Sequence, residues 1–258
     1  MPALQDPNAA PLALTRRPSA LLLDAGDTLI FFDAQAMAGV LADSGIALEP
    51  ARLEAVLHPA KRRYPARLAG GGSHLDGWAR LMLDLLELSG IEPERALAVL
   101  PELKRAHLEF NFWRRVPPGL VAALERARAA GLRLGVVSNS EGRLRDVLDR
   151  VGLSAHFELA LDSQLEGVHK PDPEIFRRAL ARMGVEPHEA LYAGDIPEVD
   201  VLGARAAGMH GVLVDAFGHF AGSPRWPRVP SVEVLIDSLL RLPVGGTVLG
   251  NTESDRSR

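Results

Sequence analysis

Short apolar runs recur along this chain, and most of them lead directly into an amphipathic helical pattern. The runs are rich in Leu, Val and Ala, as strands that are buried on both faces should be. The helical patterns close near a glycine, the residue that helix C-termini favour. The runs predict strands at Ala20–Asp24, Arg133–Ser138, Leu159–Asp162, Ala190–Gly194 and Gly211–Val214. The patterns between them predict helices at Gly119–Ala130, Glu141–Val151, Pro173–Met183 and Val199–Ala207.

This alternation predicts a mostly parallel sheet with helices on both faces, in a Rossmann-like three-layer α/β/α core. One region departs from this alternation, because residues 33–113 show only helical periodicity, interrupted at glycines, and no evident strand. We therefore expect four helices inserted after the first strand, forming an α-helical cap over the strand ends. The expected organisation is a flexible N-terminal arm at 1–18, a core at 19–32 and 114–242, a cap at 33–113, and a flexible tail at 243–258.

The bulk composition excludes several classes of partner. The 258 residues include 29 basic and 33 acidic side chains, a formal net charge of −4, which argues against a nucleic-acid partner. No apolar run is long enough to span a bilayer, and the proline-rich start lacks the features of a signal peptide. The absence of cysteine fits a reducing compartment. We therefore expect a cytoplasmic protein with no membrane partner, either a monomer or a weak homodimer.

Polar side chains stand at the ends of the predicted strands, where open α/β sheets place their chemistry. Asp24 ends the first strand, and a carboxylate there can act as a covalent nucleophile or bind a metal. Ser138 and Asn139 end the next core strand, where a hydroxyl, an amide and backbone N–H groups can bind a phosphate. Each residue taken alone would also serve as an ordinary helix cap or turn residue.

Two later segments add charged groups to this set. Lys170 precedes a stiff turn with two prolines, where a lysine can neutralise a phosphoryl group or simply be solvated ahead of a helix. Asp195 and Asp200 follow the strand that ends at Gly194. Carboxylates spaced in this way across a turn suit Mg²⁺, which binds one or two carboxylates and keeps several waters. As an alternative, Asp200 caps the helix that follows.

Together and in this order, the four segments resemble the four motifs of the haloacid dehalogenase-like hydrolases, over roughly residues 20–240. The helical insertion stands as in the subfamily with a cap between the first two motifs. The resemblance implies that Asp24 is the nucleophile and a Mg²⁺ ligand, and that Asp195 and Asp200 hold the metal or its waters. It implies that Ser138 and Lys170 bind the phosphoryl group of a small phosphorylated substrate, and that Lys170 orients Asp24.

The first motif departs from the family pattern Asp-x-Asp-x-Thr, because Gly26 stands in place of the second aspartate and Asp27 follows it. In family phosphatases that aspartate protonates the leaving oxygen and later activates water, while its backbone carbonyl binds the metal. Gly26 keeps the carbonyl but lacks the acid–base group. The loss of such a group lowers the rate by about 10²–10⁴-fold. Asp27 is either a replacement acid–base group or a turn-stabilising carboxylate. The leading expectation is therefore a Mg²⁺-dependent phosphatase, which is slow if Asp27 does not replace the missing group.

Three alternatives remain open at this point. The first is a non-catalytic or regulatory phosphate-binding protein, which Gly26 supports. The second is a 2-haloacid dehalogenase, whose first motif also lacks the second aspartate but which does not keep the arrangement of Asp195 and Asp200. The third is phosphonate hydrolysis, which resembles enzymes with a Schiff-base lysine in the cap, and the sequence identifies no such lysine.

Substrate specificity is expected to reside in the cap. Conceivable substrate contacts are Arg62, Arg63, His74, Trp78 and Arg114. Basic residues on helices more often form solvated faces, however, and a tryptophan in an amphipathic pattern more often packs in a core. None of the five is therefore assigned to the site.

Overall fold

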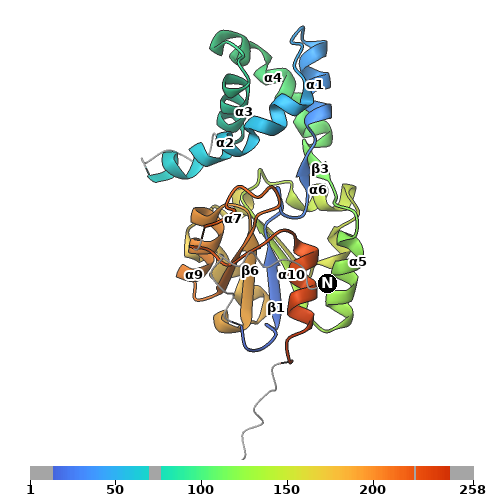
Figure 1. Ribbon diagram of the computed structural model, residues 1–258, viewed down its shortest axis with the longest axis vertical. Helices are drawn as coiled ribbons and strands as arrows, with labels where there is room; N and C mark the ends of the chain where they lie inside the picture. Colours follow the sequence, from blue (N-terminus) through green and yellow to red (C-terminus); the bar gives the residue numbers. More distant parts are fainter. Residues whose placement is uncertain (1–13, 70–76, 224, 245–258) are drawn as a thin grey trace, which may run out of the picture.

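The computed structural model describes residues 14–69, 77–223 and 225–244 and contains a six-stranded parallel sheet (Figure 1). The strand order β5-β4-β1-β6-β7-β8 puts the first strand near the centre, paired with β4 and β6. This is the parallel α/β sheet that the sequence predicts. The strands are β1 Ala20–Leu23, β4 Arg133–Ser138, β5 Leu159–Asp162, β6 Ala190–Gly194, β7 His210–Val214 and β8 Arg228–Val229.

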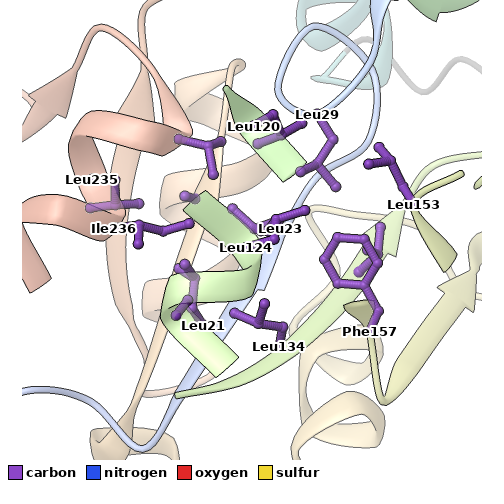
Figure 2. Close-up of a cluster of buried hydrophobic side chains, with 14 of the residues drawn as sticks. Leu21, Leu23, Leu29, Leu120, Leu124, Leu134, Leu153, Phe157, Leu235 and Ile236 are labelled. Carbon is purple, nitrogen blue, oxygen red and sulfur yellow. The ribbon is translucent and has the colours of Figure 1, made fainter. Parts of the chain in front are cut away.

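Helices cover both faces of this sheet. The odd-numbered side chains of β1, Leu21 and Leu23, pack against α5, α6 and α10 in one apolar cluster (Figure 2). The even-numbered ones, Ala20 and Leu22, pack against α8 and α9 in another. Such continuous burial on both faces explains why the strands read as unbroken apolar runs. The core helices are α5 Leu120–Ala129, α6 Leu144–Arg150, α7 Ser163–Glu166, α8 Pro173–Met183, α9 Leu202–Ala206 and α10 Val232–Leu240.

Four helices follow β1 in the chain, ahead of α5, and stand above the carboxyl ends of the strands (Figure 1). They are α1 Ala34–Asp43, α2 Pro50–Ala69, α3 Gly77–Leu88 and α4 Pro93–Phe110. We refer to them as the cap. They bury a separate apolar cluster that includes Met37, Leu53, Met82 and Leu103. An antiparallel pair, β2 Phe31–Phe32 and β3 Trp113–Arg115, joins them to the core.

Two predicted helices begin or end differently from the sequence pattern. The predicted helix at 141–151 starts at Leu144, because the Asp162 carboxylate accepts hydrogen bonds from the backbone N–H groups of Gly142 and Leu144. The predicted helix at 199–207 is a π-helical turn at Pro197–Val201 followed by the short α9. Isolated π turns of this kind are frequent at functional sites.

The chain ends also differ from expectation. Arg17, placed by the sequence in a flexible arm, donates from its backbone N–H to Pro243 and from its guanidinium to the carbonyls of Leu239 and Leu240. The last residues of the expected arm are therefore fastened to α10, while residues 1–13 and 245–258 lie outside the described residues. Among the described helices, none combines the length and apolar character needed to cross a bilayer.

Candidate active site

A buried lysine links two carboxylates at the carboxyl edge of the sheet. Nζ of Lys170 donates to Oδ1 of Asp24 at 2.7 Å and to Oδ1 of Asp200 at 2.7 Å. Its third donor goes to the hydroxyl of Tyr192 at 2.8 Å, which in turn donates to the Val137 carbonyl. Although burial alone would lower the pKa of Lys170, Asp200 and Asp24 raise it above its usual value. Lys170 therefore stays an ammonium ion that orients the Asp24 carboxylate.

The turn after β6 places Asp195 and Asp200 beside this group. Oδ2 of Asp200 accepts from the Ile196 backbone N–H at 2.8 Å, which fastens the side chain across the turn. A Cβ at position 194 would collide with the Asp200 carboxyl group, so this approach requires Gly194. Burial and the neighbouring carboxylates, opposed by Lys61, raise the pKa of Asp195 to about 7.

These carboxylates form a group that fits a divalent cation. Ligand atoms of Asp24, Asp195 and Asp200 all lie within 4.8 Å of one another. Oδ1 of Asp195 is buried and has no hydrogen-bond partner in the described part of the chain, so it remains available as a ligand. Together with Asp27, the site holds four carboxylates against two ammonium groups, an excess of two negative charges that Mg²⁺ would balance.

Asp27 lies in the turn that follows β1. The residue is 3% exposed, and its backbone φ is +57°. Its Oδ1 accepts from the Phe32 N–H at 3.4 Å, and its Oδ2 accepts from Nε1 of Trp113 at 3.1 Å and from Nζ of Lys61 at 2.8 Å. The structure thus gives Asp27 a turn-stabilising contact and two side-chain donors. Whether it acts as an acid–base group stays a prediction.

Gly26 itself lies beside the Trp113 ring. A Cβ built there would be 3.4 Å from Cδ1 of the indole, and the backbone has no positive φ, so a side chain is sterically admissible. The absence of a carboxylate at this position is therefore not forced by the local backbone. The backbone carbonyl that the family pattern uses for the metal is retained.

The site opens into a cavity of about 260 Å³ between core and cap. Asp24, Ser138 and Lys170 from the core line this cavity, together with cap residues such as Trp78 and Leu81. Ser138 is buried at the end of β4, and its phosphate-binding role stays a prediction. Asn139 also lines the cavity, but its amide bonds to the backbone N–H and carbonyl of Lys170, so it positions that residue as well.

Sequence reasoning missed three residues of the site: Lys61, Trp113 and Tyr192. The sequence identifies no Schiff-base lysine in the cap, and the structure places a cap lysine, Lys61, at the site, with its Nζ 2.8 Å from Oδ2 of Asp27 and 2.5 Å from Oδ2 of Asp195. The two carboxylates raise its pKa despite burial, so it is held as a cation rather than as the nucleophilic amine that a Schiff base requires.

Four of the five residues that the sequence offers as conceivable substrate contacts lie in different environments. Trp78 lines the cavity. Arg63 pairs with Asp84 and Glu87, and Arg114 pairs with Asp33, so both have partners within the cap segment. Arg62 lies over the Phe220 ring. His74 lies outside the described residues.

Comparison with known proteins agrees with this geometry. A family model described as haloacid dehalogenase-like hydrolase matches residues 18–208. Haloacid dehalogenase-like hydrolase domain-containing protein 3 is 37% identical in Mus musculus, over 57% of this chain and 59% of the relative, and 34% identical in Homo sapiens, over 66% and 70%. The phosphoserine phosphatase of Thermus thermophilus is 38% identical over 63% of this chain and 66% of the relative. The chain thus spans little more than half the length of the mouse relative.

Solved structures show the same fold. The magnesium-bound HAD-hydrolase YfnB from Bacillus subtilis superposes with a TM-score of 0.67 at 21% identity, covering 87% of this chain and 99% of that one. The fold and site therefore define a Rossmann-like α/β core with a helical cap and a carboxylate at the end of the first strand. With the family model matching most of its length, this chain belongs to the haloacid dehalogenase-like hydrolases.

Proposed function

We propose that the protein is a Mg²⁺-dependent phosphatase that acts on a small phosphorylated metabolite through an aspartyl-phosphate on Asp24. The observation that carries the proposal is the Lys170 ammonium held 2.7 Å from Asp24, beside the unpartnered Oδ1 of Asp195. A dianionic phosphoryl group can approach a carboxylate only where cations and donors offset their repulsion. Two relatives named as phosphatases, of phosphoserine and of glyceraldehyde 3-phosphate, support the reaction type.

In this proposal each residue has a separate task. Asp24 attacks phosphorus, and the bond from phosphorus to the alcohol oxygen breaks. Lys170 and the Ser138 hydroxyl contact the transferred phosphoryl group, and water later hydrolyses the aspartyl-phosphate. Asp24, Asp195, Asp200 and the Gly26 carbonyl would hold Mg²⁺, which supplies Lewis-acid stabilisation of the phosphoryl charge.

Removal of the metal tests this proposal. We expect phosphate release from a panel of alkyl and aryl phosphates, phosphoserine included, to fall by at least about 100-fold with a chelator and to return with Mg²⁺. Added Ca²⁺ is the matched control, because it binds similar ligands with a different geometry. A metal-independent rate over the whole panel would contradict the proposal.

A regulatory phosphate-binding protein is the second candidate, because Gly26 removes the group that normally transfers protons. We expect Gly26→Asp to raise the rate with alkyl phosphates by about 10–100-fold, since general acid–base catalysis typically contributes about 10²–10⁴-fold. Gly26→Ala is the control, because it adds the Cβ beside Trp113 without the carboxylate. Phosphate binding without turnover in the wild type, followed by turnover in Gly26→Asp, would favour the regulatory alternative.

A further inference from the structure

Lys61 is a cap residue with no role in the motifs above, yet it lies inside the site. It belongs to α2, and its Nζ bridges Oδ2 of Asp27 at 2.8 Å and Oδ2 of Asp195 at 2.5 Å. Its side chain is 13% exposed and lines the same cavity as Asp24 and Ser138. The cap therefore contributes a positive charge to a cluster of carboxylates that come from the core.

A series of contacts links this charge to position 26, where the family's acid–base aspartate is missing. A side chain at position 26 would start beside the Trp113 ring, and Nε1 of Trp113 donates to the same Oδ2 of Asp27 as Lys61 does. Position 26, Trp113, Asp27 and Lys61 thus form one contiguous group at the edge of the cavity.

Lys61 also has unused donor capacity. An ammonium group carries three hydrogens, and in the described part of the chain those of Lys61 have two carboxylate partners. One donor remains for an oxygen atom in the cavity. Because both partners are anionic, the ammonium charge stays fixed in place while a substrate binds.

We propose that Lys61 hydrogen-bonds to the leaving-group oxygen of the substrate and stabilises the negative charge that develops there, in place of the aspartate missing at position 26. This inference rests on the phosphatase function proposed above. As the oxygen–phosphorus bond breaks, its electron pair stays on the leaving oxygen, next to the ammonium group. A water molecule protonates that oxygen, and the resulting hydroxide cleaves the aspartyl-phosphate to give phosphate and free Asp24. Lys61 keeps its proton throughout.

The proposal predicts that the need for Lys61 depends on the leaving group. We expect Lys61→Gln to lower kcat/KM by about 10²–10³-fold for an alkyl phosphate, the usual effect of removing one donor to a developing oxyanion. For p-nitrophenyl phosphate, whose leaving group is stable as an anion, we expect a loss below about 10-fold, because little stabilisation is needed. Both substrates are measured at saturating Mg²⁺, with Mg²⁺ affinity determined separately by calorimetry.

Three variants keep the result interpretable. Lys104→Gln is the matched control, because Lys104 is also a cap lysine paired with a core carboxylate, Glu141, at 2.7 Å, and does not line the cavity. It should change both substrates by the same factor. Arg62→Gln, next to Lys61 on the exposed face of α2, should change neither. Lys61→Arg retains the charge and should restore most of the alkyl phosphate activity, and it serves if Lys61→Gln fails to fold.

Equal losses of kcat/KM for both substrates in Lys61→Gln would overturn the proposal. Lys61 would then have only a structural role, as a contact between cap and core. A wild type that releases no phosphate from any ester would overturn the phosphatase function, and this proposal with it.

Discussion

Replacing Asp24 by Asn should lower phosphate release by about 10⁴-fold or more, because the amide cannot form the acyl-phosphate intermediate. Loss of a nucleophile in a protease costs about 10⁶-fold in kcat, so an effect of this size is reasonable. The fold should persist, since Asn has nearly the same shape and Lys170 retains Asp200 and Tyr192 as partners. Acid-quenched wild type should carry one added phosphoryl group by mass spectrometry, and the variant none.

Asp237→Asn is the matched control for this experiment. Asp237 lies on α10, is half-exposed and pairs with Arg126 away from the cavity. Its activity should equal that of the wild type. A phosphorylated Asp24→Asn protein, or an undiminished rate, would show that another side chain is the nucleophile.

Local signals explain why much of this fold is predictable from the sequence. Helix α8 has the predicted bounds because Asp172 caps its first turn, Pro173 occupies the first helical position and Gly184 ends it with a positive φ. The strand predictions at β4, β5 and β6 agree with the structure for a related reason, namely that continuous apolar runs mark strands buried on both faces.

Much of the candidate site follows from the same logic. Asp24 and Asp195 come directly after strands and Ser138 is the last residue of one, and the carboxyl ends of parallel strands meet at one edge of the sheet. The position of Lys170 in the site is harder to predict from the sequence, because this residue belongs to a loop between two helices. Its contact with Asp24, 146 residues earlier, needs the Asn139 amide to fix the loop.

The residues that the sequence did not reveal depend on tertiary arrangement. Lys61 precedes two arginines on an amphipathic helix, and nothing local distinguishes it from a solvated residue. Only the orientation of the cap brings it to Asp195, 134 residues away in sequence. Tyr192 stands inside an apolar strand, and the sheet determines that its hydroxyl faces Lys170. The contacts of Asp27 likewise depend on a left-handed backbone conformation that its sequence neighbours do not specify.

Lys170→Met should lower the free energy of unfolding by about 3–5 kcal/mol, the usual cost of removing one partner from a buried ion pair. Lys170 is 2% exposed, and its loss leaves Asp24 and Asp200 close together without a cation. Methionine fills a similar volume, so the effect should come from charge rather than from a cavity. Urea unfolding without divalent cations measures it.

Two further variants separate charge from packing in this result. Lys104→Met removes a cation from a half-exposed pair, 39% and 34% exposed, and should cost less than about 1 kcal/mol. Adding Asp200→Asn to Lys170→Met should recover part of the lost stability, because it removes one of the two unpaired charges. This coupling is the expected sign of a double-mutant cycle between contacting charges. A double variant less stable than Lys170→Met alone would contradict this explanation. It would mean that Lys170 stabilises the protein through packing rather than by offsetting the repulsion between Asp24 and Asp200.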